Sequence, residues 1–161
     1  MNALVVYDSQ YGNTERIAQA LAGALAEHAT VRLVPMAQAP ALSSAEMDLL
    51  ILGSPTQSLG PTPAMRAFLA NIPRSALKDL PAASFDTRLH KPKWLTGSAA
   101  RGIAETLGKV GGSLLLPPES FLVTGKEGPL VDGETERAAS WARTVLGKYE
   151  ALRPRETLAA R

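Results

Sequence analysis

Residues 3–18 have the sequence ALVVYDSQYGNTERIA, and this stretch does more than any other to decide the fold. Its first five residues form an apolar run that is typical of a buried strand. From residue 13 to residue 27, apolar positions recur at helical spacing and share one face, at Ile17, Leu21, Ala24 and Leu25. A buried strand that leads directly into an amphipathic helix is the repeating unit of a parallel sheet with helices packed on it.

The same alternation of strand and helix patterns continues along the chain. Strands are predicted at residues 31–34, 49–52 and 82–86, and a last strand at 113–116 and 120–123, interrupted by Pro117 and Pro118. Helices are predicted at residues 62–71, 98–110 and 133–149. This order predicts a three-layer α/β fold with a doubly wound five-stranded parallel sheet between helices. We expect residues 1–150 to form one domain and residues 151–161 to form a flexible C-terminal tail.

The composition narrows the class of protein. Hydrophobic residues make up 45% and charged residues 20% of the 161 residues, which is a globular balance and not a disordered one. The net charge of +2 is small and its basic residues are dispersed, so no nucleic-acid partner is expected. The absence of cysteine excludes disulfides and thiolate chemistry. With no long apolar run and no secretory pattern at residues 1–8, we expect a cytoplasmic protein without a membrane segment.

The loop between the first strand and the first helix has the features of an anion site. Ser9 and Thr14 offer hydroxyl groups, Gly12 allows a close approach of the backbone, and Asn13 is expected to cap the helix. The unpaired N–H groups and the dipole of the first helical turn favour a negative charge. Because the loop has no lysine, it suits a single phosphate held by neutral donors. A capped helix with ordered water would explain the same residues equally well.

Residues 5–18 resemble the phosphate-binding signature of flavodoxins, in which a hydroxyl residue precedes Gly-x-Thr and an alanine follows four residues later. Ser9, Gly12, Thr14 and Ala18 match it. A second segment, LGSPT at residues 52–56, resembles the Gly-Ser-Pro-Thr turn that faces the flavin ring in this family. The resemblance covers residues 2–149. It implies a flavodoxin-like sheet with strand order 2-1-3-4-5, non-covalent FMN, and one-electron transfer to an unidentified redox partner protein, by a monomer or a weak homodimer.

The chain departs from the family pattern in three ways. Tyr11 stands where many members carry a small hydroxyl residue, and no aromatic residue follows Pro55 and Thr56, where Leu59 is the nearest large side chain. Flavodoxins are typically strongly acidic, whereas this chain has a net charge of +2. A partner that binds to an acidic patch is therefore not expected to bind this protein.

Two further loops are expected beside the phosphate loop, because ligands of such sheets bind at the carboxyl ends of the strands. Residues 54–63 include three prolines and suit a planar, partly apolar ring, although a rigid connector would also use them. Residues 86–97 are expected to approach the pyrimidine edge of the ring. The predicted cofactor-binding residues are Ser9, Gln10, Tyr11, Gly12, Asn13, Thr14, Ser54, Pro55, Thr56, Gln57, Ser58, Gly60, Asp86, Thr87 and Arg88. We identify no catalytic residue and no metal site.

Three side chains outside the two motifs have predicted roles. Arg88 is a candidate for a cation near the N1/O2 edge of the flavin, where it would favour the reduced ring. Trp94 is a candidate for stacking on the ring, but anchoring of its loop to the domain is the preferred role. Trp141 lies at helical spacing with apolar neighbours and is assigned to the core.

Other functions stay open at this point. An FMN-dependent NAD(P)H:quinone-type reductase shares the motifs, but the chain has no second Gly-rich dinucleotide motif and no evident catalytic acid. A flavodoxin-like binding module that has lost FMN would explain Tyr11 and the missing loop aromatics. A phosphoacceptor receiver domain is rejected, because Gly53 and Ser54 stand at the end of the third strand, where it needs an aspartate.

Overall fold

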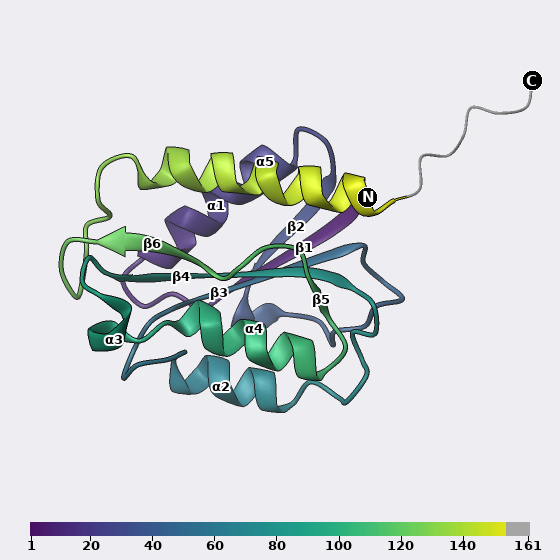
Figure 1. Cartoon of the computed structure of the whole chain (residues 1–161), viewed down its shortest axis with the longest axis horizontal. Coiled ribbons are helices and arrows are strands. Elements are labelled where there is room, and N and C mark those ends of the chain that lie inside the picture. The colour runs from purple at the N-terminus through teal and green to yellow at the C-terminus, as the bar shows by residue number, and fades with distance from the viewer. Residues whose placement is uncertain (154–161) are drawn as a thin grey trace, which may run out of the picture.

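The computed structural model describes residues 1–153 as one parallel sheet between helices (Figure 1). The strands are β1 (Asn2–Tyr7), β2 (Thr30–Pro35), β3 (Leu49–Pro55), β4 (Pro81–Leu89), β5 (Ser113–Leu114) and β6 (Glu119–Val123). Their order is β2-β1-β3-β4-β5, and β6 also pairs with β4. The predicted order 2-1-3-4-5 is therefore confirmed, with the fifth place shared by β5 and β6. Their separation falls at Pro117 and Pro118, which have no N–H to donate to a ladder.

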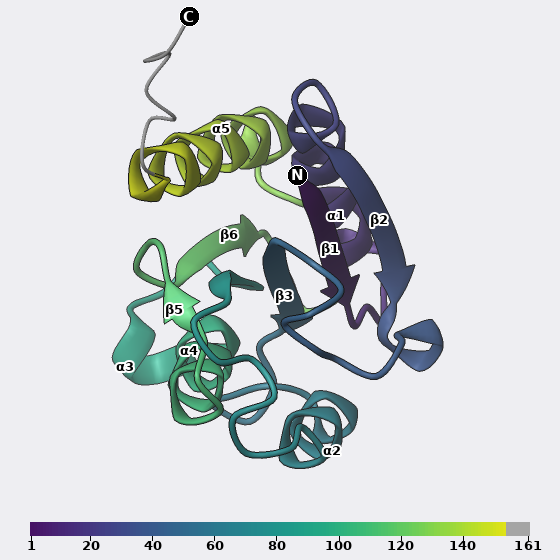
Figure 2. The same cartoon turned by 90° about the vertical axis from the view of Figure 1, so that its right-hand side faces the viewer.

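Helices cover both faces of the sheet, as predicted (Figure 2). One face carries α1 (Asn13–Leu25) and α5 (Glu134–Leu152), and the other carries α2 (Pro63–Ala70) and α4 (Ala99–Lys109). A short 3₁₀ turn (Met36–Gln38) follows β2, and the short helix α3 (Lys93–Thr96) follows β4. Of the helices within residues 1–153, none combines the length and the apolar character that a membrane crossing requires.

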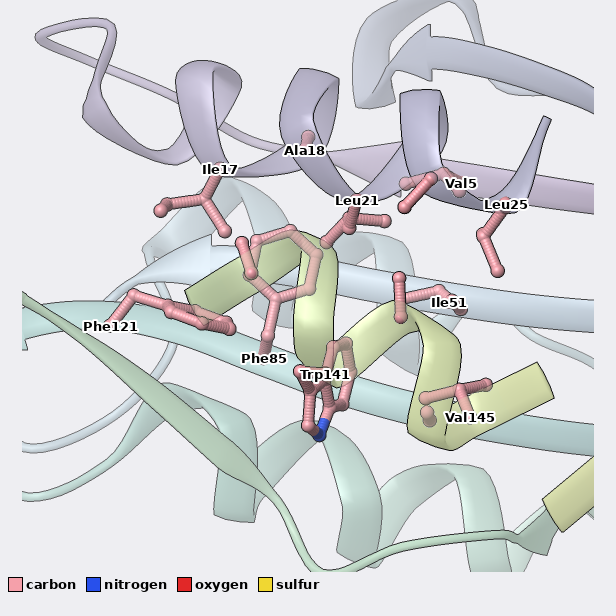
Figure 3. Close-up of a cluster of buried hydrophobic side chains, with 14 of the residues drawn as sticks. Val5, Ile17, Ala18, Leu21, Leu25, Ile51, Phe85, Phe121, Trp141 and Val145 are labelled. Atoms are coloured by element: carbon pink, nitrogen blue, oxygen red, sulfur yellow. The ribbon is translucent and has the colours of Figure 1, made fainter. Parts of the chain in front are cut away.

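The core beneath α1 and α5 centres on three aromatic rings (Figure 3). Phe85, Phe121 and Trp141 meet edge-on, with ring centroids 6.0 to 6.3 Å apart. These contacts confirm the core position predicted for Trp141. Gly53 lies beside Phe85 on the neighbouring strand, and a Cβ there would stand 2.0 Å from the ring. Position 53 consequently has no room for a side chain such as the aspartate of a receiver domain.

The last helix extends further than its pattern predicts. α5 continues to Leu152, past the predicted end at residue 149, although Tyr149 is its last buried residue. Residues 151 and 152 of the predicted tail are thus helical. Residues 154–161 of that tail lie outside the described residues.

Candidate functional site

A cavity of about 450 Å³ opens at the carboxyl ends of the central strands. Eleven of the fifteen predicted cofactor-binding residues line it, and three others join them. The lining residues are Ser9, Gln10, Tyr11, Asn13, Thr14, Pro55, Thr56, Gln57, Ser58, Thr87, Arg88, Leu89, Val123 and Lys126. The three loops singled out from the sequence therefore meet around one hollow, as the topology of such sheets requires.

The phosphate loop, residues 9–14, enters α1 through a glycine. Gly12 occupies the N-cap position with φ of +87°, in the left-handed region that glycine adopts at little steric cost. The predicted cap by Asn13 is wrong, since Asn13 is the first helical residue and the N-cap residue is Gly12, which has no side chain. Its amide instead donates to the carbonyl of Glu127 at 3.1 Å. Asn13 thereby holds the loop after β6 against the phosphate loop.

The backbone of this loop presents unused donors. Among residues 1–153, no hydrogen bond uses the backbone N–H groups of residues 10–14. The Ser9 hydroxyl accepts from the N–H of Glu15 at 3.3 Å, so its own O–H is still free to donate. Donors that converge at a helix N-terminus, next to a cavity, form a favourable environment for an anion.

Two threonine side chains join the phosphate loop to β4. Oγ1 of Thr14 lies 2.8 Å from Oγ1 of Thr87, and both residues are buried. One hydroxyl donates to the other, which leaves the second O–H able to donate to a ligand oxygen. Residues predicted separately from two loops are thus parts of one polar cluster.

The second loop contains a tight turn at Gln57–Gly60. The backbones of Gln57 and Gly60 bond to each other in both directions, at 2.8 and 3.0 Å. Between them, Ser58 and Leu59 have φ of +47° and +72°, as a type I′ turn demands of its two central residues. This turn brings Ser58 to the cavity and leaves the side chain of Leu59 exposed to solvent.

This second loop is fastened on both sides of the cavity. The side-chain amide of Gln57 donates to the side-chain carbonyl of Gln10 in the phosphate loop. The N–H of Thr56 donates to the carbonyl of Thr87 at 2.8 Å, and its hydroxyl accepts from the N–H of Ala99 at 2.9 Å. The loop is therefore held in place by contacts with the phosphate loop, β4 and the start of α4.

The third segment begins with more strand than predicted. β4 continues to Leu89, past the predicted end at Asp86, because β6 pairs with residues 85–89. Arg88 consequently lies on a strand, where its Nη1 donates to the carbonyls of Leu89 and Lys91, at 3.3 and 2.6 Å. Its Nε is buried without a hydrogen-bond partner among residues 1–153. Arg88 lines the cavity and holds the loop that follows it.

Four predicted residues do not line the cavity: Gly12, Ser54, Gly60 and Asp86. Ser54 is fully buried, donates to the carbonyl of Pro55 and accepts from the N–H of Thr62. The Asp86 carboxylate accepts from the Ser98 hydroxyl at 2.6 Å and the N–H of Ala100 at 3.0 Å. Successive side chains of a strand point to opposite faces, so Asp86 faces α4 while Thr87 faces α1.

Three lining residues, Leu89, Val123 and Lys126, were not predicted from the sequence. Leu89 lines the cavity because β4 is longer than predicted. Val123 lines it because β6 pairs with this last part of β4, where Val123 lies opposite Leu89. Lys126 lies in the loop that Asn13 holds, and no local pattern marks it. The preferred role of Trp94 is wrong: it lies in α3, is 80% exposed and anchors nothing, and it does not line the cavity.

A tyrosine forms a hydrogen bond to the first turn of α1, next to the phosphate loop. The hydroxyl of Tyr7, the last residue of β1, donates to the carboxylate of Glu15 at 3.1 Å. Burial raises the pKa of Tyr7 above its ordinary value, and the hydrogen bond and negative charge of Glu15 add to this effect. The phenol is therefore neutral at pH 7 and remains a donor.

Known structures share the fold of this chain. No curated protein matches the chain. Oxidised flavodoxin 1 of Bacillus cereus superposes with a TM-score of 0.76 at 22% identity, over 91% of this chain and 98% of the other. Flavodoxin 2 of the same organism gives 0.72 at 25% identity, over 92% and 99%. A flavodoxin from the domain Archaea gives 0.76 at 20% identity, over 93% and 99%.

A sequence model of a protein family identifies the family. The model described as a flavodoxin domain matches residues 4–107, which is more than half of the chain and includes the phosphate loop, the second loop and β4. The chain belongs to the flavodoxin family.

Proposed function

We propose that this protein binds FMN non-covalently in the cavity and carries single electrons to a redox partner protein. The observation that carries the proposal is the set of unused backbone N–H groups at residues 10–14, at the N-terminus of α1, where every residue except Gly12 lines the cavity. A phosphate would occupy such donors without any cation in the loop. The match to the family supports the same ligand.

The polar groups around the cavity fit the other parts of FMN. The hydroxyls of Ser9 and Thr14 would join the backbone donors at the phosphate, and Thr87 and Thr56 would face the sugar chain and the ring. A second cavity of about 420 Å³ adjoins the first and shares Thr56, Ser58, Arg88 and Leu89 with it. We place the planar ring where the two cavities meet.

When bound, FMN supplies one-electron redox chemistry. The residues of this chain would bind it, orient it and tune its charge. Neutral donors would hold the phosphate, and the Gln57–Gly60 turn and the end of β4 would enclose the ring. Arg88 would supply positive charge at the cavity wall. Within residues 1–153 we see no side-chain arrangement that acts on a separate substrate.

Absorbance and fluorescence spectra of the purified chain test this proposal. Added FMN should give a yellow protein with quenched flavin fluorescence, and heating should release FMN unchanged. Oxidation of NADH with a quinone as acceptor would instead favour the reductase. Failure to bind FMN after removal of any copurified ligand would contradict the proposal and favour a binding module that has lost the cofactor.

A further inference from the structure

The exposed apolar side chains of this protein are unevenly distributed. Five large ones are exposed within residues 1–153: Tyr11, Leu59, Trp94, Leu95 and Leu152. All but Leu152 lie on loops or on α3 at the carboxyl end of the sheet, the end toward which β6 points in Figure 1. None of these side chains contributes to the hydrophobic core. A concentration of exposed apolar side chains beside a cavity indicates a surface that contacts another molecule.

Leu59 and the neighbouring α3 residues Trp94 and Leu95 are exposed in two segments that meet, and we call these three residues the Trp94 patch. Its two parts meet because Gly97 pairs with Leu59 as an isolated bridge. The contact needs glycine: φ of Gly97 is +68°, and a Cβ there would lie 2.1 Å from the Leu59 carbonyl oxygen. Leu59 and Leu95 also line the second cavity together. The patch therefore borders the proposed position of the flavin ring.

The two segments that form the Trp94 patch carry charge of one sign. Residues 87–97 contain Arg88, Lys91 and Lys93 and no carboxylate, and residues 54–63 carry no charge at all. Lys91 and Lys93 are exposed, and no ion pair within residues 1–153 includes either of them. The patch thus consists of an apolar centre with unpaired positive charge beside it.

We propose that the Trp94 patch docks a protein whose contact surface is an apolar centre with an acidic rim. An exposed tryptophan is the kind of side chain that contributes most to binding at an interface, and the lysines would steer an acidic partner toward it. The identity of that partner as a redox protein rests on the proposed function, because the patch lies at the rim of the flavin cavity.

Two other occupants fit the patch less well. A second copy of this chain would bring the same lysines together, and like charges at an interface are unfavourable. An anionic membrane surface would accept tryptophan and lysine, but a membrane would not explain the position of the patch at the rim of the cavity. Both alternatives are outcomes of the test below.

The test measures docking of the full chain by amide NMR, with and without added FMN. The probe is an oxidised rubredoxin of net negative charge, whose paramagnetic iron broadens nearby amide signals. A cytochrome c of net positive charge serves as the opposite probe. We expect rubredoxin to broaden signals of residues 58–60 and 91–97, and binding to weaken with added salt. Cytochrome c should leave these signals unchanged.

Variants separate the charge of the patch from its apolar centre. Lys91→Gln with Lys93→Gln should weaken rubredoxin binding by about three- to tenfold, and Trp94→Ala by about thirtyfold. Trp94 is exposed, so its loss should leave the fold intact. The matched control, Lys109→Gln with Lys148→Gln, removes the same charge from exposed positions near the C-termini of α4 and α5 and should change nothing.

Several results would overturn the proposal. Broadening elsewhere on the surface, or equal weakening by the control pair, would show that general charge attraction is responsible. Binding to phosphatidylserine vesicles in place of rubredoxin would assign the patch to membranes, and self-association lost in Trp94→Ala would assign it to a second copy. Docking is measured without FMN as well, so rubredoxin binding in a chain that fails to bind FMN would refute only the redox role.

Discussion

The phosphate loop and residues 87–97 border the same cavity but differ in what they offer. The phosphate loop offers backbone N–H groups and neutral hydroxyls at the start of a helix, and it carries no cation. Residues 87–97 offer side chains: Arg88 at the cavity wall, then exposed lysines and Trp94. Backbone donors depend on the fold and tolerate many sequences, whereas side-chain charge depends on the residue at each position. We infer that the first region fixes which ligand binds, and the second tunes its potential and its partner.

The largest effect should come from the two left-handed glycines of these regions. Gly97→Ala should lower the free energy of unfolding by roughly 2–5 kcal/mol, because it combines an unfavourable φ with a backbone clash at Leu59. Gly12→Ala also has a positive φ, of +87°, but nothing lies within 4 Å of the new Cβ, so it should lose only about 1–2 kcal/mol. Urea unfolding without FMN compares them. Equal losses would mean that a Cβ at residue 97 is accommodated beside Leu59 without a costly clash.

The next effect concerns the phosphate loop alone. Thr14→Ala should weaken FMN binding by about 1–3 kcal/mol, because it removes one hydroxyl of the buried pair and leaves that of Thr87 without its partner. Thr14→Ser keeps the hydroxyl and is the matched control. Fluorescence titration with FMN measures both variants. An unchanged affinity in Thr14→Ala would remove Thr14 from the proposed site.

Tyr7 gives a smaller effect, with a defined pH dependence. Tyr7→Phe should lower the free energy of unfolding by about 1 kcal/mol at pH 7, because it removes the hydrogen bond to Glu15. Since the folded protein raises the pKa of Tyr7, the stabilisation is complete below the ordinary pKa of 10.0 and is lost as pH rises through the folded value.

Urea unfolding of the wild type and Tyr7→Phe at pH 7 and above pH 10 measures this dependence. The difference between the two proteins should shrink at the higher pH. A difference that stays constant would show that the hydrogen bond does not depend on the phenolic proton.

The smallest effect is expected for substitutions in residues 87–97. Arg88→Gln should leave FMN bound but make its reduction potential more negative by on the order of 30 mV, because a cation beside the ring stabilises the reduced, negatively charged flavin. Lys91→Gln with Lys93→Gln should matter less, since exposed charges are screened by salt. A redox titration measures both. If the potential does not move in Arg88→Gln, this arginine serves only to hold the carbonyls of Leu89 and Lys91.

The same comparison explains what could be predicted from the sequence. The phosphate loop was predictable because a local motif, a buried strand and a helix start are contiguous in the chain. Its capping residue was not, because Gly12 takes the left-handed conformation and Asn13 bonds to a loop that is distant in sequence. The motif alone does not show whether Gly12 or Asn13 occupies the N-cap position.

Residues 87–97 were less predictable because tertiary contacts decide their roles. Pairing with β6 lengthens β4, and the alternation along the strand then turns Asp86 toward α4 and Thr87 toward α1. Lys126 reaches the cavity only because the loop after β6 folds over the phosphate loop. The exposure of Trp94 likewise follows from the placement of α3, which no periodicity in four residues reveals.

The central claim is that the backbone donors of residues 10–14 select a ligand with a phosphate. Fluorescence titration of the ligand-free chain with FMN and with riboflavin, which lacks the phosphate, tests it most directly. If at least two of these donors bond to the charged phosphate, FMN should bind at least about 100 times more tightly than riboflavin. Comparable affinity for the two flavins would contradict the assignment of the phosphate site.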